Sequence, residues 1–169
     1  MPTGSPTSVT VDEVPAEVTY ALRAAVLRPD GGEITWAGDE DPDTFHLGAR
    51  RGGQLVGVVR FSPAPCPWRT ATAPWQLRGM ATDATVRGSG VGRAMVLDGL
   101  ARVAGRGGDL VWCDARVAAV GFYERMGFTV VTSEFDKPRI GPHVGMLRAV
   151  PEAADRPTAR ECGLGHTCG

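Results

Sequence analysis

Glycine and arginine are concentrated in one short stretch, residues 87–93, whose sequence is Arg-Gly-Ser-Gly-Val-Gly-Arg. Glycine has no Cβ, so the backbone can turn tightly there and approach a ligand closely. Apolar residues at helical spacing follow from Val96 to Ala104, so the stretch opens a helix whose first N–H groups lack partners and carry partial positive charge. Arg87 and Arg93 can add charge-assisted hydrogen bonds. The chemistry that this pattern favours is the binding of a phosphate or pyrophosphate group.

Three kinds of phosphate ligand are compatible in principle with such a stretch. A Walker loop ends in Gly-Lys followed by Ser or Thr, and this one does not. The dinucleotide fingerprint, counted from Gly88 and Gly90, needs a third glycine at the position of Arg93. The remaining pattern, Arg-x-x-Gly-x-Gly between a strand and a long helix, resembles the acetyl-coenzyme A motif of the GNAT N-acetyltransferase family.

A second segment, residues 119–128, strengthens this resemblance. It contains Ala119, Tyr123, Gly127 and Phe128 at the spacing of the family's A-x-x-x-Y-x-x-x-G-F signature. A helix cap alone explains neither the three glycines of the first motif nor the downstream tyrosine, glycine and phenylalanine. The resemblance covers roughly residues 9–150.

Hydrophobic periodicity predicts the elements that must position these motifs. Helices are expected between Pro15 and Pro29, from the glycine stretch to Gly105, and around residues 119–126. The proline-rich segment 62–74 is expected to be a loop. Strands are expected at residues 9–14, 45–50, 55–61, 75–82, 110–114, 128–133 and 143–150.

The order β-α-β-β-β-α-β-α-β-β predicts a mixed α/β domain. The resemblance implies the GNAT acyl-CoA N-acyltransferase fold, an α+β arrangement with a mostly antiparallel central sheet and flanking helices. We expect residues 9–150 to form this domain, residues 1–8 to be a flexible lead-in, and residues 151–169 to be a disordered tail.

Composition and charge restrict the partners that the sequence predicts. A net charge of −1 exerts no general attraction toward nucleic acid or an anionic membrane. No apolar run approaches the ~20 residues that a membrane span needs, and no secretory signal is present, so a cytoplasmic location is expected. Cys162, His166 and Cys168 are spaced irregularly in the tail, and we expect no metal.

The resemblance implies acetyl-CoA as co-substrate and assigns its contacts. Backbone groups of Met80 and Thr82 would pair with the pantetheine arm, and amides from residues 88–93 would hold the pyrophosphate. Coenzyme and acceptor would meet where the strands at 75–82 and 110–114 splay apart. Arg116 stands where relatives often have Asn, so a contact there is open. The residues expected to bind the coenzyme are Met80, Ala81, Thr82, Arg87, Gly88, Ser89, Gly90, Val91, Gly92 and Arg93.

Two residues are candidates for proton transfer. Tyr123 would lie near the thioester sulfur in relatives, and a phenol can protonate a leaving thiolate at modest cost; it could also simply pack on the apolar helix face. His143 has a suitable ordinary pKa, yet a lone histidine is more often structural. Asp114 could cap the next helix. The acidic run at 39–43 could attract a cationic amine or form a solvated loop.

Arg78 and Trp68 are the candidates for acceptor binding, and a carboxylate on the acceptor would suit Arg78. Strict strand alternation places Arg78 and Met80 on one face and Leu77 and Gly79 on the other. The predicted function is direct acetyl transfer to a small-molecule amine. A non-catalytic acetyl-CoA-binding module and a protein or peptide N-acetyltransferase remain as alternatives, and a homodimer is suggested by family habit alone.

Overall fold

The computed structural model describes residues 8–152, so the expectations for residues 1–7 and 153–169 lie outside the described residues. No helix in this part of the chain has the length and apolar character needed to cross a membrane. The elements are β1 (Val9–Val14), α1 (Ala16–Leu22), η1 (Arg23–Leu27), β2 (Phe45–Arg51), β3 (Gln54–Pro63), β4 (Pro74–Thr82), η2 (Ala84–Val86), α2 (Val91–Gly105), β5 (Leu110–Arg116), η3 (Val117–Ala119), α3 (Val120–Arg125), β6 (Thr129–Val130), β7 (Phe135–Lys137) and β8 (Gly141–Ala149).

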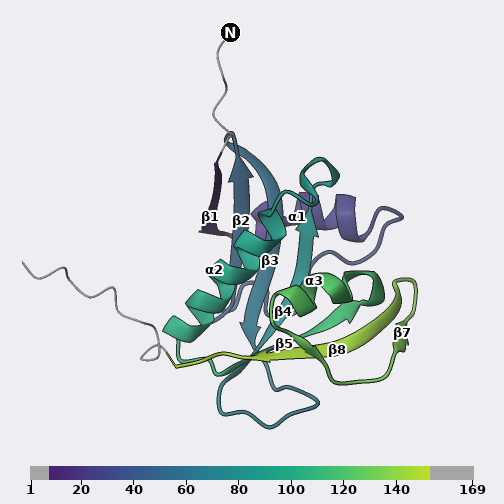
Figure 1. The fold of residues 1–169 in the computed structure, drawn as a ribbon. Coiled ribbons are helices and arrows are strands. Elements are labelled where there is room, and N and C mark those ends of the chain that lie inside the picture. Colours follow the sequence, from purple (N-terminus) through teal and green to yellow (C-terminus); the bar gives the residue numbers. More distant parts are fainter. Residues whose placement is uncertain (1–7, 153–169) are drawn as a thin grey trace, which may run out of the picture.

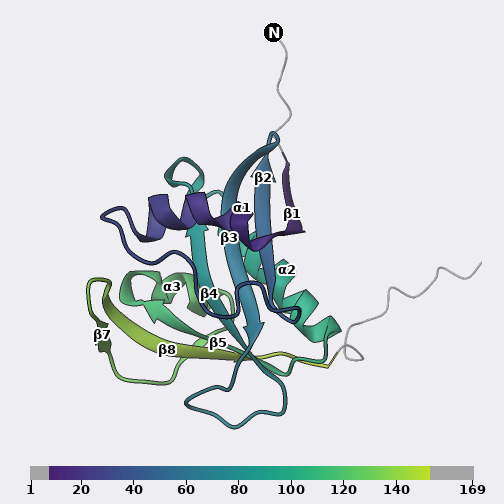
Figure 2. The same ribbon diagram turned by 180° about the vertical axis from the view of Figure 1, so that it is seen from behind.

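All strands join one 8-stranded sheet with the order β1-β2-β3-β4-β5-β8-β6, and β7 pairs with β8 at its edge. The pairs are antiparallel except for β4 and β5, which run parallel. Helix α2 covers one face of the sheet, and α1 with η1 covers the other (Figures 1 and 2). The predicted mixed, mostly antiparallel sheet with flanking helices is confirmed.

The parallel pairing of β4 with β5 is short. It runs only from Pro74 opposite Leu110 to Gln76 opposite Trp112. Beyond it, β4 continues to Thr82 along β3, while β5 continues to Arg116 along β8. The two strands therefore diverge, as the family resemblance implied.

A β-bulge interrupts β4 at the point of divergence. Arg60 pairs with Arg78, but Val58 pairs with Ala81, so β4 holds one extra residue between these pairs. Gly79 supplies the positive φ of 66° that the bulge requires. A Cβ there would lie 2.5 Å from Cζ3 of Trp36, so only glycine fits beneath that ring.

The bulge makes one prediction wrong. Strict alternation placed Met80 on the face of Arg78, opposite Leu77. Met80 instead packs against the core that contains Trp75 and Leu77, while Arg78 is exposed on the other face. The extra residue shifts the alternation of side chains along β4 by one position, and this turns the side chain of Met80 toward α2.

The segments around β8 differ in detail from the expectation. The strand predicted at 128–133 is reduced to β6, and β7 was not predicted. The proline-rich loop begins after Pro63 and is held at its end by Asp109, whose carboxylate accepts hydrogen bonds from the amides of Thr72 and Ala73 at 2.8 and 2.9 Å. This loop lies against Trp112 and Leu147.

The packing of α2 on the sheet depends on a glycine. A Cβ at Gly99 would lie 2.1 Å from Cζ of Phe61 on β3, whereas a Cβ at Gly105 in the same helix meets no heavy atom within 4 Å. We expect Gly99→Ala to lower the free energy of unfolding by about 1–3 kcal/mol through overpacking. Gly105→Ala should leave it unchanged or raise it by up to about 1 kcal/mol. Urea denaturation of both variants checks this, and equal effects would contradict it.

Candidate active site

The start of α2 offers free backbone donors. They lie beside the place past Gln76 where β4 and β5 separate, which is called the gap below. The first backbone bond of the helix runs from Ala94 N–H to the carbonyl of Gly90 at 3.0 Å, so the three preceding amides have no partner within it. Gly88 and Gly90 have φ angles of 77° and 88°, and a Cβ at either would meet nothing within 4 Å. The loop is exposed, and Arg87 and Arg93 flank it. Free amides, open space and positive charge together fit a pyrophosphate.

Arg51 joins this loop from a distant strand, and the sequence analysis missed it. Its Nη2 donates a hydrogen bond to Oγ of Ser89 at 3.1 Å, and Ser89 in turn donates to the carbonyl of Val86. The Nε of Arg51 is buried and has no partner among the described residues. The two residues are 38 positions apart in the sequence, so their contact forms only when the β2–β3 hairpin is folded.

Tyr123 lies on the α2 side of the gap. Its side chain is 7% exposed and packs edge-on against Phe122 and Phe128. Its hydroxyl donates to Sδ of Met80 at 3.6 Å, and a thioether is a weak acceptor. Burial raises the pKa of the Tyr123 phenol well above its ordinary value, so it remains protonated at neutral pH.

Met80 connects this phenol to the loop of residues 87–93. Its Cε would lie 2.8 Å from a Cβ at Gly92, in the first turn of α2. Past Gln76, the edge of β4 that faces β5 has no strand partner in the described part of the chain. The predicted coenzyme residues of β4, the loop of residues 87–93 and Tyr123 are thus brought together around one gap.

The other face of β4 carries a stack of charged and aromatic groups. The guanidinium of Arg78 lies 4.3 Å from the ring centroid of Trp36, and that of Arg23 lies 4.2 Å from it. Arg23 is 1% exposed and donates to Asp39 at 2.8 Å and to the carbonyl of Ile34 at 3.0 Å.

The acidic run at 39–43 was predicted to form a solvated loop or to attract a cationic amine. For Asp39 that prediction is wrong, because its side chain is buried. Its side chain is 5% exposed and bridges Arg23 and Arg60, the latter at 3.2 Å. Burial by itself would raise the pKa of Asp39, but hydrogen bonds from Arg23 and from the Trp36 amide lower it below its ordinary value. Asp39 therefore anchors the loop that holds Trp36.

The remaining predicted residues lie on β5, β8 and the loop that covers them. Trp68 packs edge-on against Trp112 at 5.4 Å. His143 is 4% exposed, stacks on Phe135, and donates from Nδ1 to the carbonyl of Gly141 at 2.8 Å.

Two charged residues of β5 also point away from α2. Asp114 is paired with Lys137 at 2.5 Å rather than capping a helix. Arg116 donates to the carbonyl of Leu27 at 3.3 Å, which ties the end of β5 to the end of η1.

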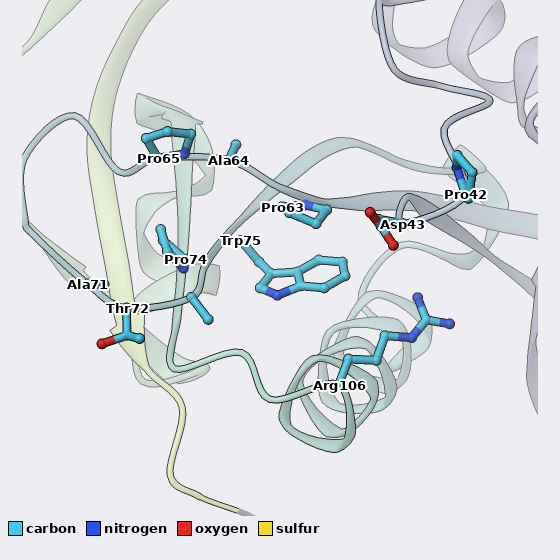
Figure 3. Close-up of a pocket in the computed structure, with 11 residues that line it drawn as sticks. Pro42, Asp43, Pro63, Ala64, Pro65, Ala71, Thr72, Pro74, Trp75 and Arg106 are labelled. Carbon is cyan, nitrogen blue, oxygen red and sulfur yellow. The ribbon is translucent and has the colours of Figure 1, made fainter.

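A cavity of about 860 Å³ lies away from this site, at the start of β4 (Figure 3). Trp75 and four prolines line it, with Asp43 and Arg106 at one side. Arg106 follows the C-terminal end of α2, a helix about 22 Å long, so the cavity and the loop of residues 87–93 lie at opposite ends of it. Within residues 8–152, no three His, Cys, Asp or Glu side chains are grouped to hold a metal ion.

Comparison with known proteins agrees with this geometry. Residues 14–128 match the family described as Acetyltransferase (GNAT) family. The chain is 32% identical over 142 residues to the uncharacterized N-acetyltransferase YitI of Bacillus subtilis (strain 168), an alignment that covers 83% of this chain and 95% of that protein.

Solved structures share the fold. An acyl-CoA N-acyltransferase from Pseudomonas aeruginosa is 26% identical, with a TM-score of 0.67 over 84% of this chain and 99% of its own. An aminoglycoside 6'-N-acetyltransferase complexed with coenzyme A is 16% identical, with a TM-score of 0.64 over 88% of this chain and 99% of its own. The fold is that of the acyl-CoA N-acyltransferases. The chain belongs to the GNAT acetyltransferase family, whose members use acetyl-CoA.

His46 makes the buried charge cluster sensitive to acid. Its Nδ1 accepts from Arg23 at 3.2 Å, and its Nε2 donates to the carbonyl of Asp39 at 2.8 Å. Burial lowers the pKa of His46 from 6.5. Below pH 6.5 the unfolded chain takes up a proton that the folded chain does not, so the free energy of unfolding falls as the pH falls.

We expect His46→Gln to be less stable than the wild type at neutral pH but to show a shallower loss of stability between about pH 7 and pH 5. Urea denaturation at a series of pH values measures both slopes. Parallel curves for the two proteins would show that His46 does not cause the acid sensitivity.

Proposed function

We propose that this protein transfers the acetyl group of acetyl-CoA directly to the amine of a small-molecule acceptor. The observation that carries the proposal is the arrangement of three features around one gap: the free amides at the start of α2, the unpaired edge of β4, and the hydroxyl of Tyr123. Family membership supports acetyl-CoA as the donor.

The coenzyme would be held at two places. Its pyrophosphate would accept hydrogen bonds from the amides of residues 88–93, apart from that of Ser89, which donates to the carbonyl of Val86 at 3.2 Å. Arg51, Arg87 and Arg93 would supply positive charge. Its pantetheine arm would lie along the free edge of β4, using backbone groups of Met80, Ala81 and Thr82 as an added strand does. This binding mode directs the thioester toward the bulge at Gly79.

Tyr123 would act as the general acid. The amine nitrogen attacks the thioester carbonyl, the C–S bond breaks, and the leaving thiolate takes the proton of the Tyr123 hydroxyl. In the free protein the Tyr123 hydroxyl donates only to the thioether of Met80, which is a weak acceptor. The hydroxyl can therefore give up this hydrogen bond and donate to the sulfur of the coenzyme instead. The dry surroundings that keep the phenol protonated also favour a neutral thiol over a thiolate.

The proton that the amine loses would pass to a base or to water, and a proton from solvent would return to the Tyr123 phenolate. His143 is the candidate that the sequence singled out. Because its Nδ1 donates to a carbonyl, its Nε2 is the nitrogen with a free lone pair. We assign it no further role.

Two alternatives make different predictions. A non-catalytic module would bind acetyl-CoA and release no free thiol with any amine. A protein or peptide N-acetyltransferase would act on polypeptide amines in preference to small ones. A thiol-release assay over a panel of small amines and peptides separates all three.

We expect Tyr123→Phe to lower kcat by about a hundredfold or more while leaving the Kd for acetyl-CoA within about twofold. The variant removes one hydroxyl and keeps the ring that packs against Phe122 and Phe128. Thiol release gives kcat, and calorimetric titration gives Kd. Tyr20→Phe is the matched control, because Tyr20 lies in α1 on the other face of the sheet. Unchanged turnover in Tyr123→Phe would remove the role of general acid.

A further inference from the structure

We propose that the acceptor amine also carries a carboxylate, and that Arg78 binds this carboxylate beside the gap between β4 and β5. The inference rests on the proposed acetyl transfer and names its substrate class: an amino acid or a similarly small amino acid analogue. Arg78 would thus be a specificity-determining residue.

Arg78 lies where β4 separates from β5. It follows Gln76 and Leu77, immediately past the last pair of β4 with β5, and its side chain is exposed on the face opposite α2. In the described part of the chain, its guanidinium has no hydrogen-bond or salt-bridge partner; it rests on the ring of Trp36 at 4.3 Å. Its five N–H donors therefore remain available for a planar anion.

The ring on which this guanidinium rests is itself held in place. Trp36 is held between the bulge at Gly79 and the buried Arg23, and Asp39 accepts hydrogen bonds from Arg23 and from the amide of Trp36. A guanidinium that rests on such a ring loses less conformational freedom when it binds a carboxylate.

The charge of the cluster favours an anion. Arg23 and Arg60 share one buried carboxylate, Asp39, and Arg78 lies on the ring of Trp36 that also contacts Arg23. Asp41 acts on Arg60 as a second negative charge, and the pKa of His46 is lowered by burial. The Nε atoms of Arg23 and Arg60 are buried without partners.

Desolvation of the part of Arg78 that lies over Trp36 is the main cause that lowers its pKa. The positive charge of Arg60 lowers that pKa further, while Asp39, Glu33 and Asp114 oppose the shift. A carboxylate bound to Arg78 would offset the repulsion from Arg60.

The opposite side of the gap does not offer a site for a polycation. Asp114 of β5 is already paired with Lys137. Arg116 of the same strand lies near Arg28, whose pKa is lowered by burial and by the charge of Arg116. Polyamines and other multiply charged cations would meet repulsion here, whereas a zwitterion would not.

The spacing along β4 suits a small acceptor. Arg78 precedes Met80 by two residues, with the bulge at Gly79 between them, so both lie close to the same point of β4. The proposed thioester position lies near the bulge at Gly79, between them. When an amine and a carboxylate are separated by one or a few carbon atoms, the carboxylate can reach Arg78 while the amine reaches the proposed thioester position.

The test uses matched acceptors that differ only in charge: α-amino acids and their α-amides, with spermidine as a polycation. Thiol release gives kcat/KM for each with the wild-type protein, Arg78→Gln, Arg78→Lys and, as control, Arg50→Gln, whose side chain lies at the β2–β3 hairpin. We expect the amino acid to exceed its amide roughly ten- to a hundredfold in wild type, and Arg78→Gln to abolish that ratio by lowering only the amino acid value. Arg78→Lys should retain part of the ratio, and Arg50→Gln all of it.

Equal use of amino acids and amides, preference for spermidine, or an equal loss on both members of a pair in Arg78→Gln would each overturn the inference. These outcomes leave acetyl transfer itself intact. A binding measurement distinguishes the opposite case, in which no amine is acetylated. N-acetyl amino acids, but not their amides, should then still raise Tm in the presence of coenzyme A in an Arg78-dependent way, and absence of that shift would overturn the anion site.

Discussion

The short parallel pairing of β4 with β5 is the constraint on which the rest of the structure depends. After three residue pairs, each strand follows its antiparallel neighbour, so the two separate and leave β4 with an edge that no strand of residues 8–152 pairs with. Backbone donors and acceptors without partners are costly inside a protein, and a ligand that pairs with them is favoured for that reason. The bulge at Gly79 sits where the separation begins and turns Met80 and Arg78 to opposite faces.

The two faces of the gap are chemically different, and this difference separates the two proposed substrates. The α2 side combines free amides, the contact of Arg51 with Ser89, and the buried phenol of Tyr123. The α1 side carries the stack of Arg78, Trp36 and Arg23, anchored on Asp39. A donor bound from the first side and an acceptor bound from the second would meet only at the bulge, which limits acetyl transfer to that point.

The sequence predicted what depends on local patterns. The glycine stretch at 87–93 and the helix behind it are determined by neighbouring residues. Strand β1 follows from alternation, β2 and β3 from the hairpin signal between them, and β5 from a short apolar run. The bulge was not predictable from alternation, because it places Gly79, at a positive φ, against the ring of Trp36, which is far away in the chain. The contact of Arg51 with Ser89 was missed, and the burial of Asp39 beside Arg60 was not predicted, for the same reason. Each pair is far apart in the sequence and is brought together only by the tertiary structure.

The central claim is that the amides opening α2 bind the diphosphate of coenzyme A. Backbone amide NMR during a coenzyme A titration tests it most directly, because each N–H reports its own hydrogen bonding. The account predicts that the amides of Gly88, Gly90 and Gly92 shift most strongly on binding, together with that of Thr82 on β4. Binding that leaves these amides unperturbed, and instead moves those of Ala71, Ala73 and Trp75 around the distant cavity, would contradict it.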